Sequence, residues 1–438
     1  MLILVALQAA ASVPVPPAAV TEAVRTDPAF RARAEEAARF LGGEGTYDTL
    51  FAPDFRARVP KAQIDAINAQ LATSLGKPTG VESIAPTGPW SARVRFGFER
   101  GTLNADLTVD PAAPHAITGL LLKGAQPRGA AAASIDAVVA QLAALPGATG
   151  FAFARLGDGA PVTAQAHEAA RPLAIGSAFK LVILAELARS IAAGERRWSD
   201  TVTLDGAPLP GGAYTRQPKG TRVSYRELAE RMISVSDNSA TDILLFDLGR
   251  DKVEAMLPVV GMTDGGGRNR PFLGTLEAFK LKGVDGAALG REYAALDPAG
   301  RRRMLAGKVA ATPVSAIVRD LFQDKKPVAI EQIEWFASPN DLIRTFDWLR
   351  RHSDGPGGAD LRAVLSKNPG LPGPAAAWRY VGYKGGSEPG VLSMNFLLQG
   401  KDGGWYALSA TWNDTARDVD QLRFMGLVET ALTLAAPK

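Results

Sequence analysis

The sequence contains no cysteine and only three histidines in 438 residues. Without cysteine the chain can form no disulfide, no thiolate metal site and no thiol nucleophile. His115, His167 and His352 stand in no ligand pattern such as His-Glu-x-x-His. We therefore expect no metal and no cofactor, and any covalent chemistry has to use serine, threonine, lysine or carboxylate side chains.

The chain also lacks an excess of charge of one sign. It has 49 Lys and Arg against 45 Asp and Glu, for a net charge of +4, and its basic residues are scattered in short runs. Short basic runs among acidic and apolar neighbours are typical of solvated helix faces. We therefore expect no nucleic-acid partner, and we expect a monomer that binds a small molecule.

The apolar run at the N-terminus is short. Met1–Ala11 ends in small residues and is followed by the proline-rich stretch Val13–Pro17. Such a run is too short to span a bilayer and resembles the apolar region and cleavage site of an export signal. Residues 1–20 are thus expected to be signal-peptide-like, the product periplasmic or secreted, and its membrane contact limited to export.

Two patterns of hydrophobic residues predict a small α+β domain over residues 21–124. Residues 29–41 and 61–75 have apolar residues at helical spacing, whereas 94–98, 103–109 and 117–122 alternate or run as strands do. Helices followed by antiparallel strands form a domain of about this size. Residues 125–133, rich in Gly, Pro and Ala, are the expected linker.

Residues 134–438 are expected to form a second domain. We expect a helix over 134–145 and two strands over 151–155 and 162–165, followed by a long helical block over 177–257. Two further strands are expected over 390–398 and 405–412, and a final amphipathic helix over 419–432. Strands at both ends of the segment predict one sheet that brings the two ends of the domain together, with an all-helical insert between them.

The first stretch that could take part in catalysis is Ser177-Ala-Phe-Lys180, at the start of an apolar helix. At a separation of three, a hydroxyl and an amine lie on one face of the first turn. The positive end of the helix favours a developing alkoxide, and a buried amine can lose its proton and act as a base. The pattern occurs a second time, at Ser74-Leu-Gly-Lys77, so it is weak alone.

Two further stretches have ordinary explanations when each is taken alone. Ser236-Asp237-Asn238 could direct two polar side chains into a cleft, or it could simply cap the following helix. Tyr383-Lys384-Gly385-Gly386-Ser387 could place an amine beside a strand edge open to substrate, or it could be a glycine-rich turn with a solvated lysine.

Taken together, the three stretches resemble the Ser-x-x-Lys, Ser-Asp-Asn and Lys-x-Gly motifs of class A β-lactamases and penicillin-binding proteins. Residues 179–198, 223–249 and 338–349 also resemble class A sequence. The resemblance covers roughly residues 134–438. It implies an α+β fold, a β-lactamase/transpeptidase-like sandwich of an antiparallel sheet with an all-helical subdomain, preceded here by the small α+β domain.

The resemblance also implies roles for individual residues. Ser177 is the nucleophile that forms an acyl-enzyme, and Lys180 activates it. Ser236, between Lys180 and Lys384, passes a proton to the leaving group. The substrate-binding residues are Asn238, Gly386 and Ser387, and the backbone amides of Ser177 and Ser387 form an oxyanion hole. The implied activity is hydrolysis of β-lactams or of related esters and D-alanyl peptides.

One motif of the family is missing. Class A enzymes have a deacylating glutamate in a Glu-Pro-x-x-x-Asn loop, and no such string lies between Asn238 and Ser338. Glu277 is the one nearby substitute, although it is equally explained as a surface partner of Lys280 on the same helix. The hypothesis is that the acyl-enzyme forms but hydrolyses slowly.

Other interpretations remain open at this point. The chain could be a weakly catalytic or non-catalytic binder of β-lactam-like or cell-wall ligands. A Ser–His pair with His167 has no supporting pattern, and neither Ser177 nor Ser387 lies in the Gly-x-Ser-x-Gly motif of α/β-hydrolases. The first domain loosely resembles ketosteroid-isomerase-like or cystatin-like folds, and no chemistry is assigned to it.

Overall fold

The computed structural model describes residues 25–129 and 131–437 and contains two compact units. Unit 1 comprises residues up to 130 together with 420–426, and unit 2 comprises 131–419 and 427–438. The division at residue 130 falls inside the expected linker. The expected signal-like segment, residues 1–20, lies outside the described residues. No helix in the described part of the chain is long and apolar enough to cross a membrane.

Unit 1 places four helices before a four-stranded antiparallel sheet in the order β1-β2-β3-β4. The elements are α1 (Pro28–Leu41), α2 (Tyr47–Leu50), α3 (Pro53–Arg58), α4 (Lys61–Leu75), β1 (Pro78–Gly88), β2 (Ser91–Phe98), β3 (Gly101–Val109) and β4 (Ile117–Pro127). The Asp27 side chain caps α1 by accepting the Ala29 amide at 2.8 Å, directly before Pro28. Strand β4 continues to Pro127, so it includes the first residues of the expected linker.

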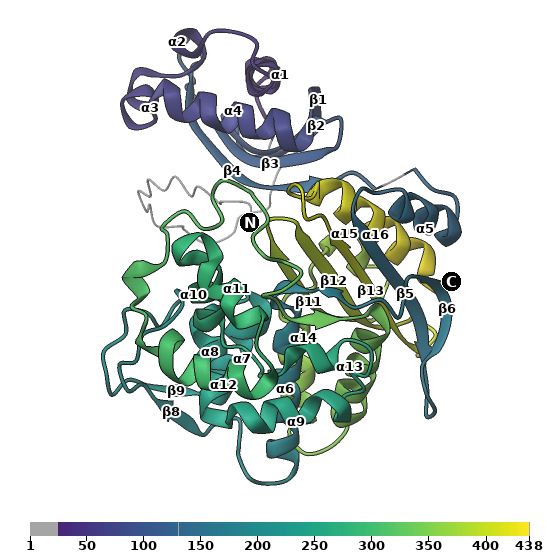
Figure 1. Cartoon of the computed structure of the whole chain (residues 1–438). Coiled ribbons are helices and arrows are strands. Elements are labelled where there is room, and N and C mark those ends of the chain that lie inside the picture. The colour runs from purple at the N-terminus through teal and green to yellow at the C-terminus, as the bar shows by residue number, and fades with distance from the viewer. Residues whose placement is uncertain (1–24, 130, 438) are drawn as a thin grey trace. The chain divides into compact units, whose positions relative to one another are not determined.

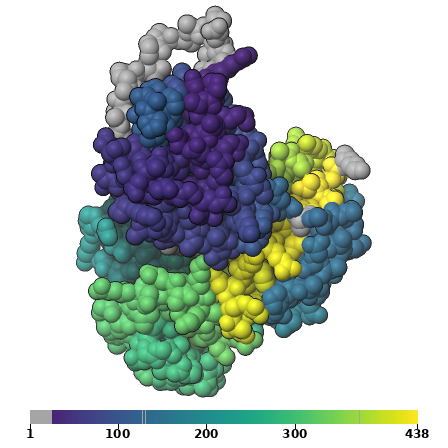
Figure 2. Space-filling view, turned by 90° about the horizontal axis from the view of Figure 1, so that it is seen from above, coloured from purple at the N-terminus to yellow at the C-terminus, as the bar shows by residue number. Residues whose placement is uncertain are grey.

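Unit 2 is built around a five-stranded antiparallel sheet in the order β11-β12-β13-β5-β6. Its strands are β5 (Ala148–Leu156), β6 (Val162–His167), β11 (Tyr380–Glu388), β12 (Val391–Gln399) and β13 (Trp405–Asn413). Strand β12 is buried over nearly its whole length, because helices cover both faces of the sheet. Helices α5 (Ile135–Ala143) and α16 (Gln421–Ala435), from the two ends of the unit, lie side by side on one face (Figures 1 and 2).

The other face of the sheet carries the helical part of unit 2 (Figure 1). Its helices are α6 (Lys180–Ala192), α7 (Tyr225–Ser234), α8 (Asn238–Leu248), α9 (Arg250–Val259), α10 (Thr275–Gly283), α11 (Ala288–Ala294), α12 (Pro298–Met304), α13 (Pro339–His352) and α14 (Gly358–Ser366). The short helix α15 (Pro372–Ala375) lies beside α16 instead (Figure 1). Short 3-10 or π turns are η1 (Gly176–Phe179), η2 (Gly266–Asn269), η3 (Asp285–Ala287), η4 (Leu305–Val309) and η5 (Val314–Ala316). The expected α+β class, with an antiparallel sheet and a helical region, is confirmed.

The expected helical block over 177–257 is interrupted. A two-stranded hairpin of β8 (Thr201–Thr203) and β9 (Arg222–Ser224) lies between α6 and α7. A second small pair joins β7 (Leu173–Ala174) to β10 (Phe336–Ala337). Because the Ile175 amide also donates to the Trp335 carbonyl at 3.0 Å, this pair holds the segment directly before η1 in place.

Candidate functional site

Turn η1 presents Ser177 at the start of α6. The preceding residue, Gly176, has φ 47°, and a Cβ there would lie 2.9 Å from the Ser387 amide nitrogen, so only glycine fits. The Ser177 side chain is partly exposed. The hydrogen bonds among the described residues include none from its hydroxyl. The hydroxyl is therefore held at a helix start and available to an incoming group.

The Lys180 amine lies at the buried end of the same turn. The residue is fully buried, and its Nζ donates to the Ser236 carbonyl at 2.7 Å, to Asn238 Oδ1 at 2.8 Å and to Ser236 Oγ at 3.2 Å. Burial lowers the pKa of Lys180 to about 7, although the carboxylates of Asp242 and Asp237 oppose this shift. An amine with a pKa near neutrality is suited to act as a general base.

The Ser236-Asp237-Asn238 loop serves both purposes considered from the sequence. Asp237 caps α8 by accepting the Ala240 amide at 2.9 Å, and it also accepts the Ala213 amide at 2.7 Å. Ser236 has φ 59°, a left-handed conformation that directs its hydroxyl and its carbonyl towards Lys180. Because Asp237 caps the helix, the side chains of Ser236 and Asn238 are free to accept hydrogen bonds from Lys180.

Lys384, on β11, approaches the Ser236 hydroxyl from the sheet. Its Nζ donates to Ser236 Oγ at 3.0 Å and to the Gly385 carbonyl at 2.7 Å, and the residue is buried. Burial, and then the neighbouring Lys180, hold the pKa of Lys384 well below its usual value. The Ser236 hydroxyl therefore lies between two amines, which is the arrangement that the resemblance implies.

Strand β11 packs directly against the nucleophile turn at Gly386. A Cβ on Gly386 would lie 2.0 Å from the Ile175 carbonyl oxygen and 2.4 Å from the Ser177 nitrogen. The backbone of the next residue, Ser387, lies beside Gly176, and its side chain is exposed. The amides of Ser177 and Ser387 are thus brought into the neighbourhood that an oxyanion hole requires.

Glu277 is not the partner of Lys280. Its carboxylate accepts two hydrogen bonds from Arg250, at 2.9 and 2.6 Å, and one from the Gly274 amide at 2.7 Å in a capping box at the start of α10. The Lys280 amine instead donates to the Val309 carbonyl at 2.9 Å. The expected i, i+3 pair is therefore wrong, because the half-buried Arg250 guanidinium makes two charge-assisted hydrogen bonds to the carboxylate.

His167 lies on β6 and is hydrogen-bonded, through Nε2, to Thr149 Oγ1 at 3.0 Å. The structure gives it no hydrogen bond to Ser177 within the described residues. The Ser–His alternative therefore has no geometric support.

Sequence reasoning missed Asp242. It follows Asn238 by one helical turn and lies on the same face of α8. The buried carboxylate accepts the Thr275 amide at 2.6 Å and the Leu276 amide at 2.9 Å. Burial raises the pKa of Asp242 to about 6, against the effect of these hydrogen bonds. The i, i+4 spacing from Asn238 is a signal that could have identified it.

The aromatic residues behind the nucleophile turn form a rigid support. Phe179 stacks on Trp335 with ring centroids 3.7 Å apart and meets Phe272 edge-on at 5.8 Å. The Trp335 indole donates to the Leu273 carbonyl at 3.1 Å. This packing ties η1 to the segment before α10. At that place the chain has Arg270-Pro271, and Arg270 is exposed.

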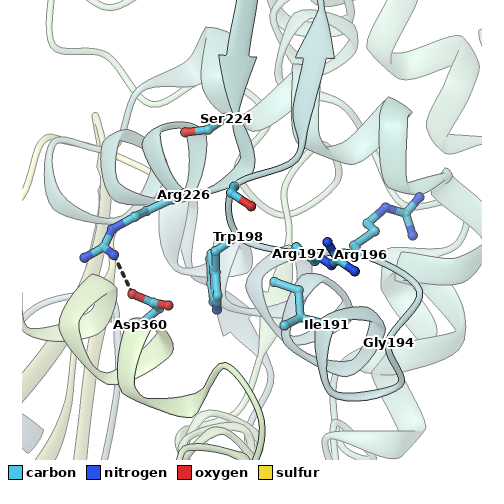
Figure 3. A pocket seen from close by; sticks show the side chains of 9 residues that line it. Ile191, Gly194, Arg196, Arg197, Trp198, Ser224, Arg226 and Asp360 are labelled. Carbon is cyan, nitrogen blue, oxygen red and sulfur yellow. Dashed lines mark hydrogen bonds and ion pairs between the residues drawn. The ribbon is translucent and has the colours of Figure 1, made fainter.

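A separate surface pocket of about 550 Å³ lies elsewhere in unit 2 (Figure 3). Its lining comprises Ile191, Gly194, Arg196, Arg197, Trp198, Ser199, Ser224, Arg226 and Asp360. Arg226 points to Asp360 and pairs with it at 2.5 Å (Figure 3). None of the residues around Ser177 lines this pocket, and we assign it no chemistry. Across residues 25–129 and 131–437, no cluster of three or more His, Asp or Glu could hold a metal ion.

Solved structures similar to this chain have low identities. A β-lactamase from Sphaerobacter thermophilus is 20% identical, with a TM-score of 0.46, over 68% of this chain and 95% of that one. PBP-A is 14% identical, with a TM-score of 0.47, over 70% and 97%. A β-lactamase from Xanthomonas campestris is 18% identical, with a TM-score of 0.44, over 69% and 95%. At these values the likenesses bear on neither substrate nor mechanism.

No curated protein matches the chain at a significant level. The model of the Beta-lactamase enzyme family matches residues 130–326, which is less than half of the chain. The matched residues contain Ser177, Lys180, Ser236 and Asn238, while Lys384 lies beyond them. The part of unit 2 that is similar to the Beta-lactamase enzyme family therefore includes turn η1 and the Ser236-Asp237-Asn238 loop.

Proposed function

We propose that unit 2 is a serine hydrolase that forms an acyl-enzyme at Ser177 and releases the product slowly. Its substrates are β-lactams or related esters and D-alanyl peptides, either small molecules or fragments of peptidoglycan. The exported protein would meet them in the periplasm or outside the cell, as a monomer. The observation that carries the proposal is the Ser236 hydroxyl, hydrogen-bonded by Lys180 and Lys384 beside the turn of Ser177.

In the acylation step, Ser177 Oγ attacks the substrate carbonyl while Lys180 accepts the hydroxyl proton. The Ser236 hydroxyl then passes its proton to the leaving nitrogen or oxygen and regains one from the Lys180 ammonium, which restores both groups. The amides of Ser177 and Ser387 stabilise the negative oxygen of the tetrahedral intermediate, an interaction that is worth about 3 kcal/mol for each donor. The Lys180 and Lys384 amines both lie within hydrogen-bonding distance of the Ser236 hydroxyl, so a proton can pass between these groups.

The remaining residues hold the substrate. Asn238 positions its amide, and the glycine at 386 lets it lie along the strand edge, with the Ser387 hydroxyl beside it. Lys384 attracts a substrate carboxylate. Burial lowers the pKa of Lys384, and a bound anionic substrate opposes that shift by stabilising the ammonium form.

Slow deacylation follows from the groups available to activate water. The Glu-Pro-x-x-x-Asn string is missing, and Glu277 is engaged with Arg250 and the Gly274 amide. Both oxygens of the Glu277 carboxylate accept hydrogen bonds from these partners, so neither is free to bind and orient a water molecule. Hydrolysis of the ester therefore lacks the base that makes class A turnover fast.

The test is intact-mass spectrometry after incubation with a penicillin. The expected result is a gain of one penicillin mass that decays slowly, and no gain in Ser177→Ala. Ser74→Ala is the matched control, because Ser74 begins the other Ser-x-x-Lys copy and should leave the adduct unchanged.

Three outcomes would contradict the proposal in different ways. Labelling of Ser177→Ala would place the nucleophile elsewhere. Rapid turnover of a reporter cephalosporin would contradict slow deacylation. Ligand binding without any mass gain would favour the non-catalytic binder.

A further inference from the structure

Three buried charged side chains meet behind the end of β11. Lys282, on α10, donates to Glu334 at 2.7 Å and also pairs closely with Glu388, the last residue of β11. The Lys282 and Glu334 side chains are each 1% exposed, whereas Glu388 is 11% exposed. Neither the acylation step nor the binding of substrate uses this cluster, and Glu388 is its one member that solvent can reach.

The strand geometry puts Glu388 next to the nucleophile. Side chains two residues apart project from the same face of a strand, so Lys384, Gly386 and Glu388 share one face of β11. A Cβ built on Gly386 would lie 2.4 Å from the Ser177 nitrogen, so the strand passes close to that turn, and two residues of strand span roughly 7 Å. Glu388 therefore lies on the other side of Ser177 from Lys384, directly after the proposed oxyanion donor at Ser387.

The charges of the cluster do not balance as a simple ion pair. One carboxylate is enough to neutralise the Lys282 ammonium, and a second one adds repulsion between like charges. Burial raises the pKa of Glu388 well above its usual range, and the neighbouring Glu334 raises it further. The pKa of Lys282 is raised despite burial, because both carboxylates face it. The Glu388 carboxyl therefore holds its proton to a higher pH than an ordinary glutamate does.

A purely structural role explains only part of this arrangement. A tether between α10 and the segment before β10 needs Lys282 and Glu334 alone, and both are almost completely buried. The additional carboxyl is at the strand end nearest the site, and it is the partly exposed member. A carboxyl with a raised pKa near a reacting group is suited to general-base chemistry.

We propose that Glu388 is the base that activates water in the slow deacylation step. This inference rests on the proposed acyl-enzyme at Ser177. The water oxygen bonds to the acyl carbonyl carbon as its proton moves to the Glu388 carboxylate. The tetrahedral intermediate then breaks its bond to Ser177 Oγ, and the proton returns from Glu388 to that oxygen. The acid product leaves, and the hydroxyl and the carboxylate are both restored.

Burial and the neighbouring Glu334 raise the pKa of Glu388, so less of it is in the basic form at a given pH than for an ordinary glutamate. The fraction of base increases as pH rises, so deacylation should accelerate from mildly acidic to mildly alkaline pH. Lys384, on the same face of β11, acts in acylation and binding and is separated from Glu388 by the Ser177 turn.

The experiment follows the decay of the penicillin adduct by intact mass after removal of free penicillin. In Glu388→Gln, we expect acylation within a few-fold of wild type and a deacylation rate on the order of 100-fold lower that no longer depends on pH. Glu388→Asp should restore part of the rate, because it keeps a carboxylate at the strand end.

Glu334→Gln is the matched control, since it removes one carboxylate from the same cluster. It should keep deacylation and shift the midpoint of its pH dependence to lower pH, because Glu334 raises the pKa of Glu388. A merely structural cluster predicts equal loss of thermal stability in both variants and no such shift. If Glu388→Gln does not fold, the wild-type pH profile and the Glu334→Gln midpoint decide the question.

The possible failures are distinguishable. An adduct that forms in Glu388→Gln and decays at the wild-type rate overturns this inference and leaves the proposed function intact. A wild-type deacylation rate that is flat with pH, with no shift in Glu334→Gln, does the same. A wild-type chain that gains no mass overturns the proposed function and the inference together.

Discussion

At the scale of single residues, Ser236 joins the two halves of the site. Its left-handed backbone, φ 59°, is costly for a residue with a side chain, on the order of 1–2 kcal/mol. The same conformation allows both its carbonyl and its hydroxyl to accept from Lys180, while Lys384 reaches the hydroxyl from β11. Ser236, the strained residue, therefore links Lys180 of the helical part to Lys384 of the sheet through hydrogen bonds.

A first prediction concerns the pH dependence of acylation. The pKa of Lys180 is about 7, and its neutral form is the proposed base. The acylation rate should therefore rise with pH and level off above neutrality, since deprotonated amine increases as pH passes the pKa. Stopped-flow acylation with a penicillin across this range is the measurement.

Lys180→Met is the variant for that experiment. It should lower the acylation rate by about 100-fold or more and remove the rise near pH 7. A wild-type profile without a step near neutrality, or one that persists in Lys180→Met, would assign the proton transfer to another group.

Much of the site could be predicted at this scale. The spacing of Ser177 and Lys180 and the resemblance of the three motifs identified residues that the fold brings together. The Glu277 partner was wrong, because helical spacing counts only neighbours on the same helix and Arg250 comes from α9. The Lys282–Glu334–Glu388 cluster joins three distant segments, and no local pattern indicates such a cluster.

At the scale of elements, the contact between β11 and η1 decides whether the site can form. A second prediction is that Gly386→Ala lowers acylation by on the order of 100-fold or more, because a Cβ would collide with two backbone groups, the Ile175 carbonyl and the Ser177 amide. Acylation rate and thermal midpoint are measured together.

Gly159→Ala is the control for that substitution. Gly159 lies in the loop between β5 and β6, and a Cβ there meets no atom within 4 Å. It should leave both quantities unchanged. Normal acylation in Gly386→Ala would contradict the close packing of strand and turn.

The strands that sequence reasoning missed have no readable period-two pattern of buried and exposed residues. Strand β1 has mostly exposed or half-exposed residues without alternation, since it is an edge strand. Strands β8 and β9 are three residues each, too short for a period-two pattern. Helix α4, by contrast, has the predicted bounds, because a buried apolar stripe runs along a full-length helix.

At the scale of the whole molecule, the described residues contain two large hydrophobic cores. Phe96 and Phe98 belong to the core of unit 1, and Phe179 and Phe346 to that of unit 2. A third prediction is that Phe96→Ala destabilises unit 1 by about 3–5 kcal/mol through the cavity it leaves, and does not alter acylation at Ser177.

Hydrogen exchange with mass spectrometry is the measurement for Phe96→Ala. Exchange should accelerate in β1–β4 and remain slow in β11–β13. Phe346→Ala is the matched substitution in the other core, and it should reverse the pattern and reduce acylation. Equal acceleration in both sheets for either variant would mean that the cores unfold as one.

The pairing of β13 with β5 has a consequence for biosynthesis. Trp405 pairs with Leu156, so the central strands of the sheet come from opposite ends of unit 2. A ribosome delivers β5 long before β13, and contacts between such distant parts of a chain form slowly. The nascent polypeptide can pair β5 with β6 early, but the other edge of β5 stays unpaired until β13 has been translated, and any chain stopped before residue 405 lacks the strand that joins the two halves of the sheet.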